Sequence, residues 1–272
     1  ALLETMWAKA RDRAAEEAAE LSQLIAEDGF NHDVTPWDWR HYAGKARAAR
    51  YDFNEAEIKP YLQLEKMIEA AFHTAETLFG ITFRAHDGVQ AYHPDVRVFE
   101  ALDANGKRLA IFLGDYFARP SKRSGAWMSE FQEQHKLTVG PDNVGQTPIV
   151  VNVMNFAKAP PGEPVLITMD DARTLFHEFG HALHGMLSDV PSPSISGTSV
   201  SRDFVELPSQ LFEHWLTVPE TLQRFAVHHD TGEAIPQILL DKMRAAAKFN
   251  KGFANVEFTS SALVDMAFHS LD

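Results

Sequence analysis

The residues best suited to chemistry are two histidines and a glutamate in the segment His-Glu-Phe-Gly-His, residues 177–181. On a helix, positions i and i+4 lie one turn apart, so the imidazoles of His177 and His181 could bind one metal ion at about 2.0–2.1 Å. Glu178 is offset around the helix and could accept a proton from a metal-coordinated water without binding the metal itself. The pattern predicts a zinc ion (Zn²⁺, one per chain) that serves peptide hydrolysis, with Glu178 as the general base.

The segment that carries this motif is predicted to be a helix over 169–187. Thr168 followed by Asp171 resembles a capping box, and acidic residues suit the positive end of a helix dipole. At about 100° per residue, an apolar stripe lies on the side of the helix opposite the histidines. The stripe consists of Ala172, Leu175, Phe179, Leu183 and Met186. A histidine pair with a purely structural role is the alternative, but it does not explain this stripe or the intervening glutamate.

Spacing alone leaves the third metal ligand open. The pattern H-E-x-x-H-x-x-G-x-x-H is excluded, because His184 and Leu187 occupy the positions of its glycine and last histidine. Among the downstream carboxylates, we favour Glu206 as the third metal ligand, since a helix-turn-helix return could bring it to the histidines. The alternative is an acidic helix face that only contacts solvent.

The helix predicted over 201–217 would carry further polar groups on the face of Glu206. Asp203 or Glu213 could hold a metal-binding histidine in one tautomer. Pro208 lies inside this predicted helix and lacks a backbone N–H, so a kink is expected there.

Composition limits the class of protein. The chain has 272 residues, of which 45% are hydrophobic and 23% charged, so a folded globular protein is expected. The net charge of −13 disfavours nucleic acids and anionic membranes as partners. The absence of cysteine excludes disulfides and thiolate chemistry. With no membrane span or signal peptide apparent, we expect a cytoplasmic location.

Hydrophobic periodicity predicts a mainly α fold with a small β-sheet (α+β). Three regions are expected: a helical region over 1–80, a small sheet and hairpin region over 81–165, and a zinc-binding helical catalytic region over 166–272. They would form one compact unit, part of a larger parent protein. The expected helices are 1–28, 37–51, 54–79, 169–187, 201–217, 219–229, 235–249 and 257–270. A hairpin is expected from strands near 96–101 and 109–113, and a third strand over 149–153.

Several longer segments resemble the thimet oligopeptidase family of zinc peptidases, and within it the bacterial peptidyl-dipeptidase (Dcp) branch. The segments around the metal motif are Phe176–Gly185, Ser196–Thr198 and Arg202–Gln210. The others are Pro36–Trp39, Tyr92–Val96, Lys122–Trp127 and Phe249–Gly252. The resemblance covers essentially the whole chain.

The resemblance implies that His177, His181 and Glu206 bind zinc and that Glu178 is the base. It also implies a mostly helical fold with a channel that admits short, unstructured peptides, from which C-terminal dipeptides would be released. The strand over 149–153 would border this channel, and a substrate could pair with its edge through Asn152 and neighbouring backbone groups. An endo-acting oligopeptidase and a noncatalytic zinc- or peptide-binding fragment are the alternatives.

The chain also departs from this family. Members are more than twice as long, with a helical half before the position of Ala1 and a tyrosine-containing C-terminal segment. The five tyrosines of this chain all precede the predicted metal helix. Because tyrosines of that segment are the family's expected oxyanion stabilisers, we expect this chain alone to bind zinc and hydrolyse peptides weakly, unless the missing segments of the parent protein act as its partner.

Other residues remain ambiguous on sequence grounds. His184 could face a substrate or have no role, and His228, His229 and His269 lack the spacing of metal ligands. Lys122 and Arg123 could bind a peptide carboxylate, although a solvated hairpin end is the simpler interpretation. Trp37 and Trp39 are expected to serve packing rather than ligand stacking.

Overall fold

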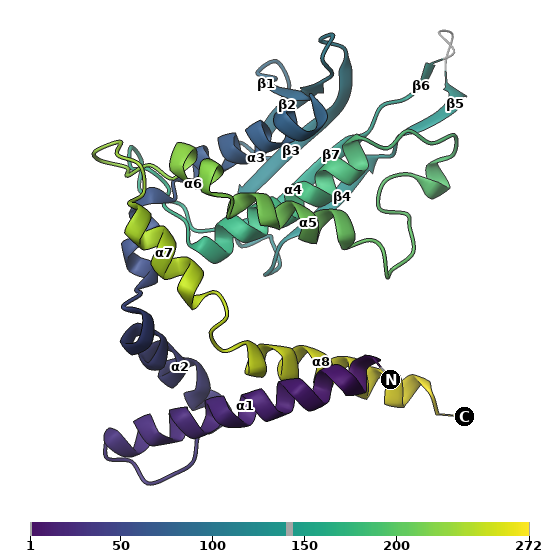
Figure 1. The fold of residues 1–272 in the computed structure, drawn as a ribbon. Coiled ribbons are helices and arrows are strands. Elements are labelled where there is room, and N and C mark those ends of the chain that lie inside the picture. Colours follow the sequence, from purple (N-terminus) through teal and green to yellow (C-terminus); the bar gives the residue numbers. More distant parts are fainter. Residues whose placement is uncertain (1, 140–143, 272) are drawn as a thin grey trace. The chain divides into compact units, whose positions relative to one another are not determined.

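A computed structural model describes residues 2–139 and 144–271, so Ala1, the expected first residue of a helix, lies outside the described residues. The chain divides into two compact units (Figure 1). Unit 1 consists of residues 1–54 and 236–272, and unit 2 of residues 55–235. The expected fold class, mainly α with a small sheet, is confirmed. The three regions expected from the sequence stay a prediction.

Unit 1 is helical. Its elements are α1 (Leu2–Glu27), α2 (Pro36–Tyr51), α7 (Gln237–Ala246) and α8 (Lys251–His269). Helices α1 and α8 lie in close contact, because a Cβ on Gly252 would lie 2.6 Å from the backbone nitrogen of Ala14. The buried carboxylate of Glu17 accepts hydrogen bonds from the backbone N–H groups of Gly252 and Phe253. The carboxylate of Glu17 thus accepts hydrogen bonds from N–H groups at the start of α8 that have no partner within the helix, and its negative charge interacts favourably with the helix dipole.

The two tryptophans near the start of α2 differ in their surroundings. Trp39 is buried, stacks on Phe253 with ring centroids 4.2 Å apart, and donates from Nε1 to Asn250 Oδ1 at 2.9 Å. Trp37 is 79% exposed. The expected packing role is therefore confirmed for Trp39, whereas the side chain of Trp37 lies at the surface.

Unit 2 contains a five-stranded sheet in the order β1-β2-β3-β7-β4. The bounds of these strands are Thr82–Ala85 (β1), Arg97–Leu102 (β2), Arg108–Phe117 (β3), Trp127–Gln132 (β4) and Ile149–Phe156 (β7). Strands β2 and β3 form the expected antiparallel hairpin, and β3 pairs with β7 in parallel. A second sheet consists of β5 (His135–Val139) and β6 (Val144–Gln146).

The expectation of only three strands is wrong. Strand β1 is mostly exposed and β4 has no buried residue, so neither shows the regular burial of alternate apolar side chains. The helix expected over 54–79 is also too long. Its first part consists of two short 3-10 helices (Glu55–Glu57 and Lys59–Tyr61), and α3 begins only at Leu64. Pro60 lacks the N–H that a continuous helix would need.

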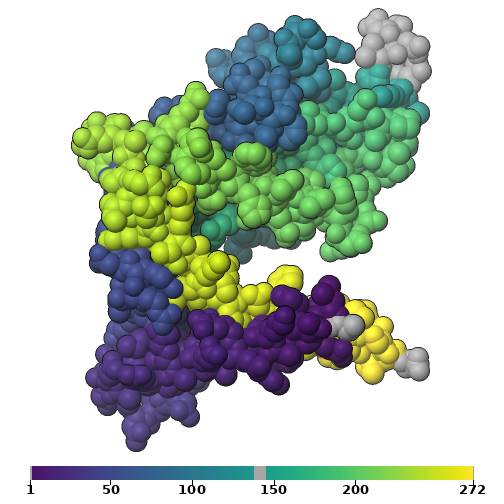
Figure 2. All heavy atoms as spheres, viewed as in Figure 1, coloured from purple at the N-terminus to yellow at the C-terminus, as the bar shows by residue number. Residues whose placement is uncertain are grey.

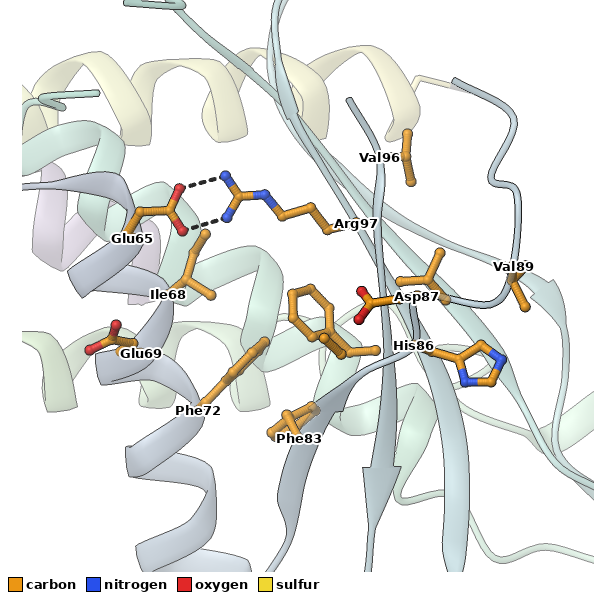
Figure 3. Close-up of a pocket in the computed structure, with 13 residues that line it drawn as sticks. Glu65, Ile68, Glu69, Phe72, Phe83, His86, Asp87, Val89, Val96 and Arg97 are labelled. Carbon is orange, nitrogen blue, oxygen red and sulfur yellow. Dashed lines mark hydrogen bonds and ion pairs between the residues drawn. The ribbon is translucent and has the colours of Figure 1, made fainter. Parts of the chain in front are cut away.

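Helices α3 (Leu64–Phe79) and α4 (Met169–Met186) pack on one face of the sheet. Phe112 from β3 contacts both helices, with ring centroids 6.2 Å from Phe72 and 5.3 Å from Phe179. Between α3 and β2, Arg97 donates two hydrogen bonds to Glu65, at 2.5 and 2.6 Å (Figure 3). Both residues line a pocket of ≈ 520 Å³, and so do Phe72 and Phe83, which stack on each other. Aromatic packing thus connects the outer strands with the motif helix.

A buried charge cluster holds the ends of β3 and β7 together. Asp115, which is fully buried, accepts two hydrogen bonds from Arg119, both at 2.7 Å, and one from the hydroxyl of Tyr92 at 2.8 Å. The Nζ of Lys122 lies 2.9 Å from Asp115 Oδ1 and donates to the backbone oxygen of Met154 at 2.6 Å. The expectation that Lys122 ends a solvated hairpin is therefore wrong, since its side chain is only 3% exposed.

Helices α5 (Leu207–Leu216) and α6 (Pro219–Phe225) follow a loop that includes a 3-10 turn at Pro193–Ile195. Helix α4 lies between α5 and the sheet (Figure 1). Figure 2 shows α5 and α6 (green) at the surface of unit 2, beside the blue segment that includes α3. Helices α6 and α7 are shorter than the helices expected over 219–229 and 235–249, and α8 begins at Lys251 rather than at 257. In the described part of the chain, no helix has the length and apolar character needed to cross a membrane.

Candidate metal centre

Helix α4 begins as the sequence predicts. Thr168 Oγ1 accepts from the backbone N–H of Asp171, and Asp171 Oδ2 accepts from that of Thr168, both at 3.0 Å. This reciprocal capping satisfies two donors at the helix start. All five residues of the predicted apolar stripe are buried: Ala172, Leu175, Phe179, Leu183 and Met186. Phe176, His181 and Ala182 are buried as well, because α4 also packs against α5.

The structure brings three of the predicted site residues together. The Oε2 of Glu206 lies 3.3 Å from His177 Nε2 and 3.1 Å from His181 Nε2. Zinc bonds of about 2.0–2.1 Å in a tetrahedron place neighbouring ligand atoms about 3.3 Å apart. The two imidazole planes are inclined by 85°, so their in-plane lone pairs can converge. These residues could hold a metal ion, and the donor set fits zinc.

A further carboxylate orients the first histidine. His177 Nδ1 lies 2.7 Å from Glu213 Oε1. An ionised carboxylate only accepts hydrogen bonds, so Nδ1 carries the proton and the lone pair of Nε2 faces Glu206. Of the two residues proposed from the sequence for this role, Glu213 has the required geometry. Asp203 makes no hydrogen bond or ion pair within the described ranges.

His181 has a different environment. It is 9% exposed, and its Nδ1 is buried without a hydrogen-bond partner among the described residues. Burial lowers the pKa of His181, with the negative charge of Glu206 opposing this effect. Burial thus favours the neutral imidazole, which is the form that binds a metal ion.

Glu206 is positioned by the first turn of α5. The helix predicted over 201–217 begins only at Leu207, and Glu206 is its N-cap residue. Pro208 therefore occupies the first turn, where no backbone N–H is needed, and the expected kink is wrong. Gly180 allows α5 to approach: a Cβ there would lie 2.7 Å from the Cα of Ser209 and 3.0 Å from the Cβ of Phe212. The glycine of the His-Glu-Phe-Gly-His segment thus permits the contact that brings Glu206 to the histidines.

The proposed base lies between the metal-binding group and the sheet. Glu178 is 7% exposed. Burial raises the pKa of Glu178 to about 7, and Glu206 adds to this rise, while His177 and a backbone hydrogen bond from Met128 of β4 oppose it. A carboxylate with this pKa can both accept and release a proton near neutral pH.

The prediction that a substrate pairs with an edge of the strand over 149–153 is wrong. Strand β7, which contains Asn152, lies between β3 and β4, so both of its edges are already paired. The other edge of β4, the strand that reaches Glu178 through Met128, pairs with no strand in the described part of the chain. Its backbone groups, rather than those of β7, are available to an extended peptide.

The remaining histidines do not extend this site. Donor atoms of His228, His229 and Asp230 lie close together. However, the rings of His228 and His229 are stacked, with planes inclined by only 16° and centroids 5.0 Å apart. Their in-plane lone pairs therefore lie in two nearly parallel planes and do not converge on one ion. His184 has a buried Nδ1 with no partner in the described residues, and burial lowers its pKa. Exposed His269 pairs with Asp265.

Sequence reasoning did not identify Ser209, although its hydroxyl contacts Glu206 directly. The available signal was its position three residues after Glu206 on a predicted helix, a spacing that brings side chains together.

Comparison with known proteins gives consistent matches. The model of peptidase family M3 matches residues 1–272. The chain is 46% identical over 264 residues to dipeptidyl carboxypeptidase of Escherichia coli (strain K12), covering 97% of this chain and 38% of that protein. It is 35% identical over 263 residues to oligopeptidase A of the same organism, covering 96% of this chain and 38% of that protein. The chain thus spans less than half the length of these relatives.

Proposed function

Because the chain belongs to peptidase family M3, we propose that its metal centre is the zinc site of a peptidase that acts on short, unstructured peptides and releases C-terminal dipeptides. The observation that carries the proposal is the convergence of His177 Nε2, His181 Nε2 and Glu206 Oε2 beside buried Glu178. The name of the dipeptidyl carboxypeptidase relative supports the mode of cleavage.

The three converging residues would hold one zinc ion, with Glu213 fixing the orientation of His177. A bound zinc ion supplies Lewis-acid polarisation of a carbonyl group and lowers the pKa of water. Glu178 would accept a proton from the attacking water and deliver it to the leaving amine. In the metal-free chain, burial raises the pKa of Glu178 to about 7, which makes the carboxylate a stronger base than an exposed glutamate.

The substrate would lie along the unpaired edge of β4. An extended peptide could form backbone hydrogen bonds there, as in strand addition to other sheets. Strand β4 also supplies the backbone hydrogen bond from Met128 that acts on Glu178. Pairing at this edge would therefore align the peptide bond with the base.

Endo-cleavage is the second candidate, favoured by the similarity to oligopeptidase A. Peptides with a free or an amidated C-terminus distinguish the two modes. Release of dipeptides only from the free form supports a peptidyl-dipeptidase, whereas equal cleavage of both forms supports the oligopeptidase.

Hydrolysis by the 272-residue chain is a separate part of the proposal. Glu178→Gln should abolish it, because the group that accepts the proton of the attacking water is removed. Hydrolysis unaffected by this substitution would contradict the role of Glu178, and zinc binding without any hydrolysis would favour a noncatalytic module. A cytoplasmic location and the absence of nucleic-acid partners stay predictions.

A further inference from the structure

We infer that Ser209 is a positioning residue for the metal: its hydroxyl holds the Oε2 atom of Glu206 toward the two imidazoles. This inference rests on the proposed metal site. The hydroxyl would not touch the metal or the substrate and would act only through Glu206.

The contact joins Ser209 to the carboxylate oxygen that faces both histidines. Ser209 Oγ lies 3.0 Å from Glu206 Oε2, and this same oxygen lies 3.3 Å from His177 Nε2 and 3.1 Å from His181 Nε2. A carboxylate oxygen has two lone pairs. Oε2 can therefore accept the hydroxyl hydrogen with one lone pair and direct the other toward the imidazoles.

A second acceptor competes for the hydroxyl. Ser209 Oγ also lies 2.9 Å from the backbone oxygen of Glu206, and a serine has only one hydroxyl hydrogen. That backbone oxygen already accepts from the N–H of Gln210 at 2.9 Å. The start of α5 is thus satisfied without the hydroxyl, which leaves the carboxylate as the acceptor that depends on Ser209.

The two ends of this contact differ in mobility. The side chain of Glu206 is 51% exposed, and a long, flexible side chain must lose rotamer freedom to point in one direction. Ser209 is fully buried, and its Cα would lie 2.7 Å from a Cβ on Gly180. The hydroxyl therefore extends from a rigid part of the α4–α5 contact, which suits it to orient the more mobile carboxylate.

The test compares Ser209→Ala with wild type by measuring zinc affinity in competition with a chelator and the melting temperature of the metal-free protein. The substitution removes one oxygen atom and adds no volume. We expect an affinity loss of about 10–100-fold, as is typical for hydrogen-bond partners of metal ligands. The metal-free melting temperature should change little, and the visible spectrum of the Co²⁺-substituted protein should change.

Ser260→Ala is the matched control. Ser260 Oγ donates to the backbone oxygen of Glu257, also three residues earlier on a helix, at 3.0 Å. This control should bind zinc as wild type does.

The possible outcomes distinguish an error in the inference about Ser209 from an error in the proposed metal site. Wild-type zinc affinity in Ser209→Ala, with a lower metal-free melting temperature, would show that the hydroxyl serves only the helix start and would overturn the inference. If wild type itself binds no zinc, the proposed metal site is wrong and the inference falls with it.

Discussion

Replacing Gly180 by alanine tests whether the close contact between α4 and α5 builds the metal centre. The added Cβ would lie 2.7 Å from the Cα of Ser209 and 3.0 Å from the backbone oxygen of Pro208. Ordinary carbon contacts are about 3.5–4.0 Å, so α5 must move by roughly 1 Å. Overpacking of this kind costs about 1–3 kcal/mol, and the better helix propensity of alanine returns about 1 kcal/mol.

We therefore expect Gly180→Ala to lose up to about 2 kcal/mol of unfolding free energy, measured by urea denaturation. Zinc affinity should fall at least about 10-fold, because metal–ligand distances tolerate only about ±0.2 Å. Gly44→Ala is the control: Gly44 lies inside α2, and its Cβ would meet no atom within 4 Å. That variant should be stabilised by up to about 1 kcal/mol. Equal stability gains in both variants, with zinc affinity unchanged, would refute the packing argument.

Three further predictions follow from the contacts of single side chains. Glu213→Ala should weaken zinc binding about 10–100-fold in chelator competition, since His177 loses the acceptor for its Nδ1 proton; unchanged affinity would count against this role. Asp115→Asn should cost about 3–5 kcal/mol in urea unfolding, because Arg119 and Lys122 lose their buried counter-charge. Its control, exposed Asp241→Asn, should change stability by less than about 0.5 kcal/mol. For Glu178, the pKa is about 7 in the folded chain and about 4.3 when unfolded. Folding favours the protonated carboxyl, so metal-free wild type should lose stability relative to Glu178→Gln between about pH 4.5 and 7; parallel pH profiles would contradict this.

The motif helix could be predicted because its signals are local. Thr168 and Asp171 cap it within one turn, and the apolar stripe repeats at the helical period. The spacing of His177 and His181 then follows from helix geometry. Glu206 was a candidate from spacing and was favoured by the family resemblance, but its place as an N-cap residue was not predicted. The predicted helix start at 201 is too early, and for that reason Pro208 was taken for an interior proline.

Other features depend on contacts that the local sequence does not specify. The burial of Lys122 depends on Asp115 and on the backbone of β7, which is distant in the sequence. Strand β4 lies at a sheet edge and consists only of half-buried and exposed residues, so apolar periodicity does not reveal it. Because β4 lies outside β7 in the sheet, the unpaired edge belongs to β4 and not to β7. These features follow from strand order and tertiary packing.

The most direct test of the account is the number of zinc ions bound per chain, measured by calorimetric titration and elemental analysis in wild type and in Glu206→Ala. The account predicts one zinc ion per wild-type chain and an affinity loss of at least about 100-fold in the variant, since the carboxylate near both imidazoles is removed. Absence of zinc from wild type, or equal affinity in the variant, would contradict the proposed metal centre.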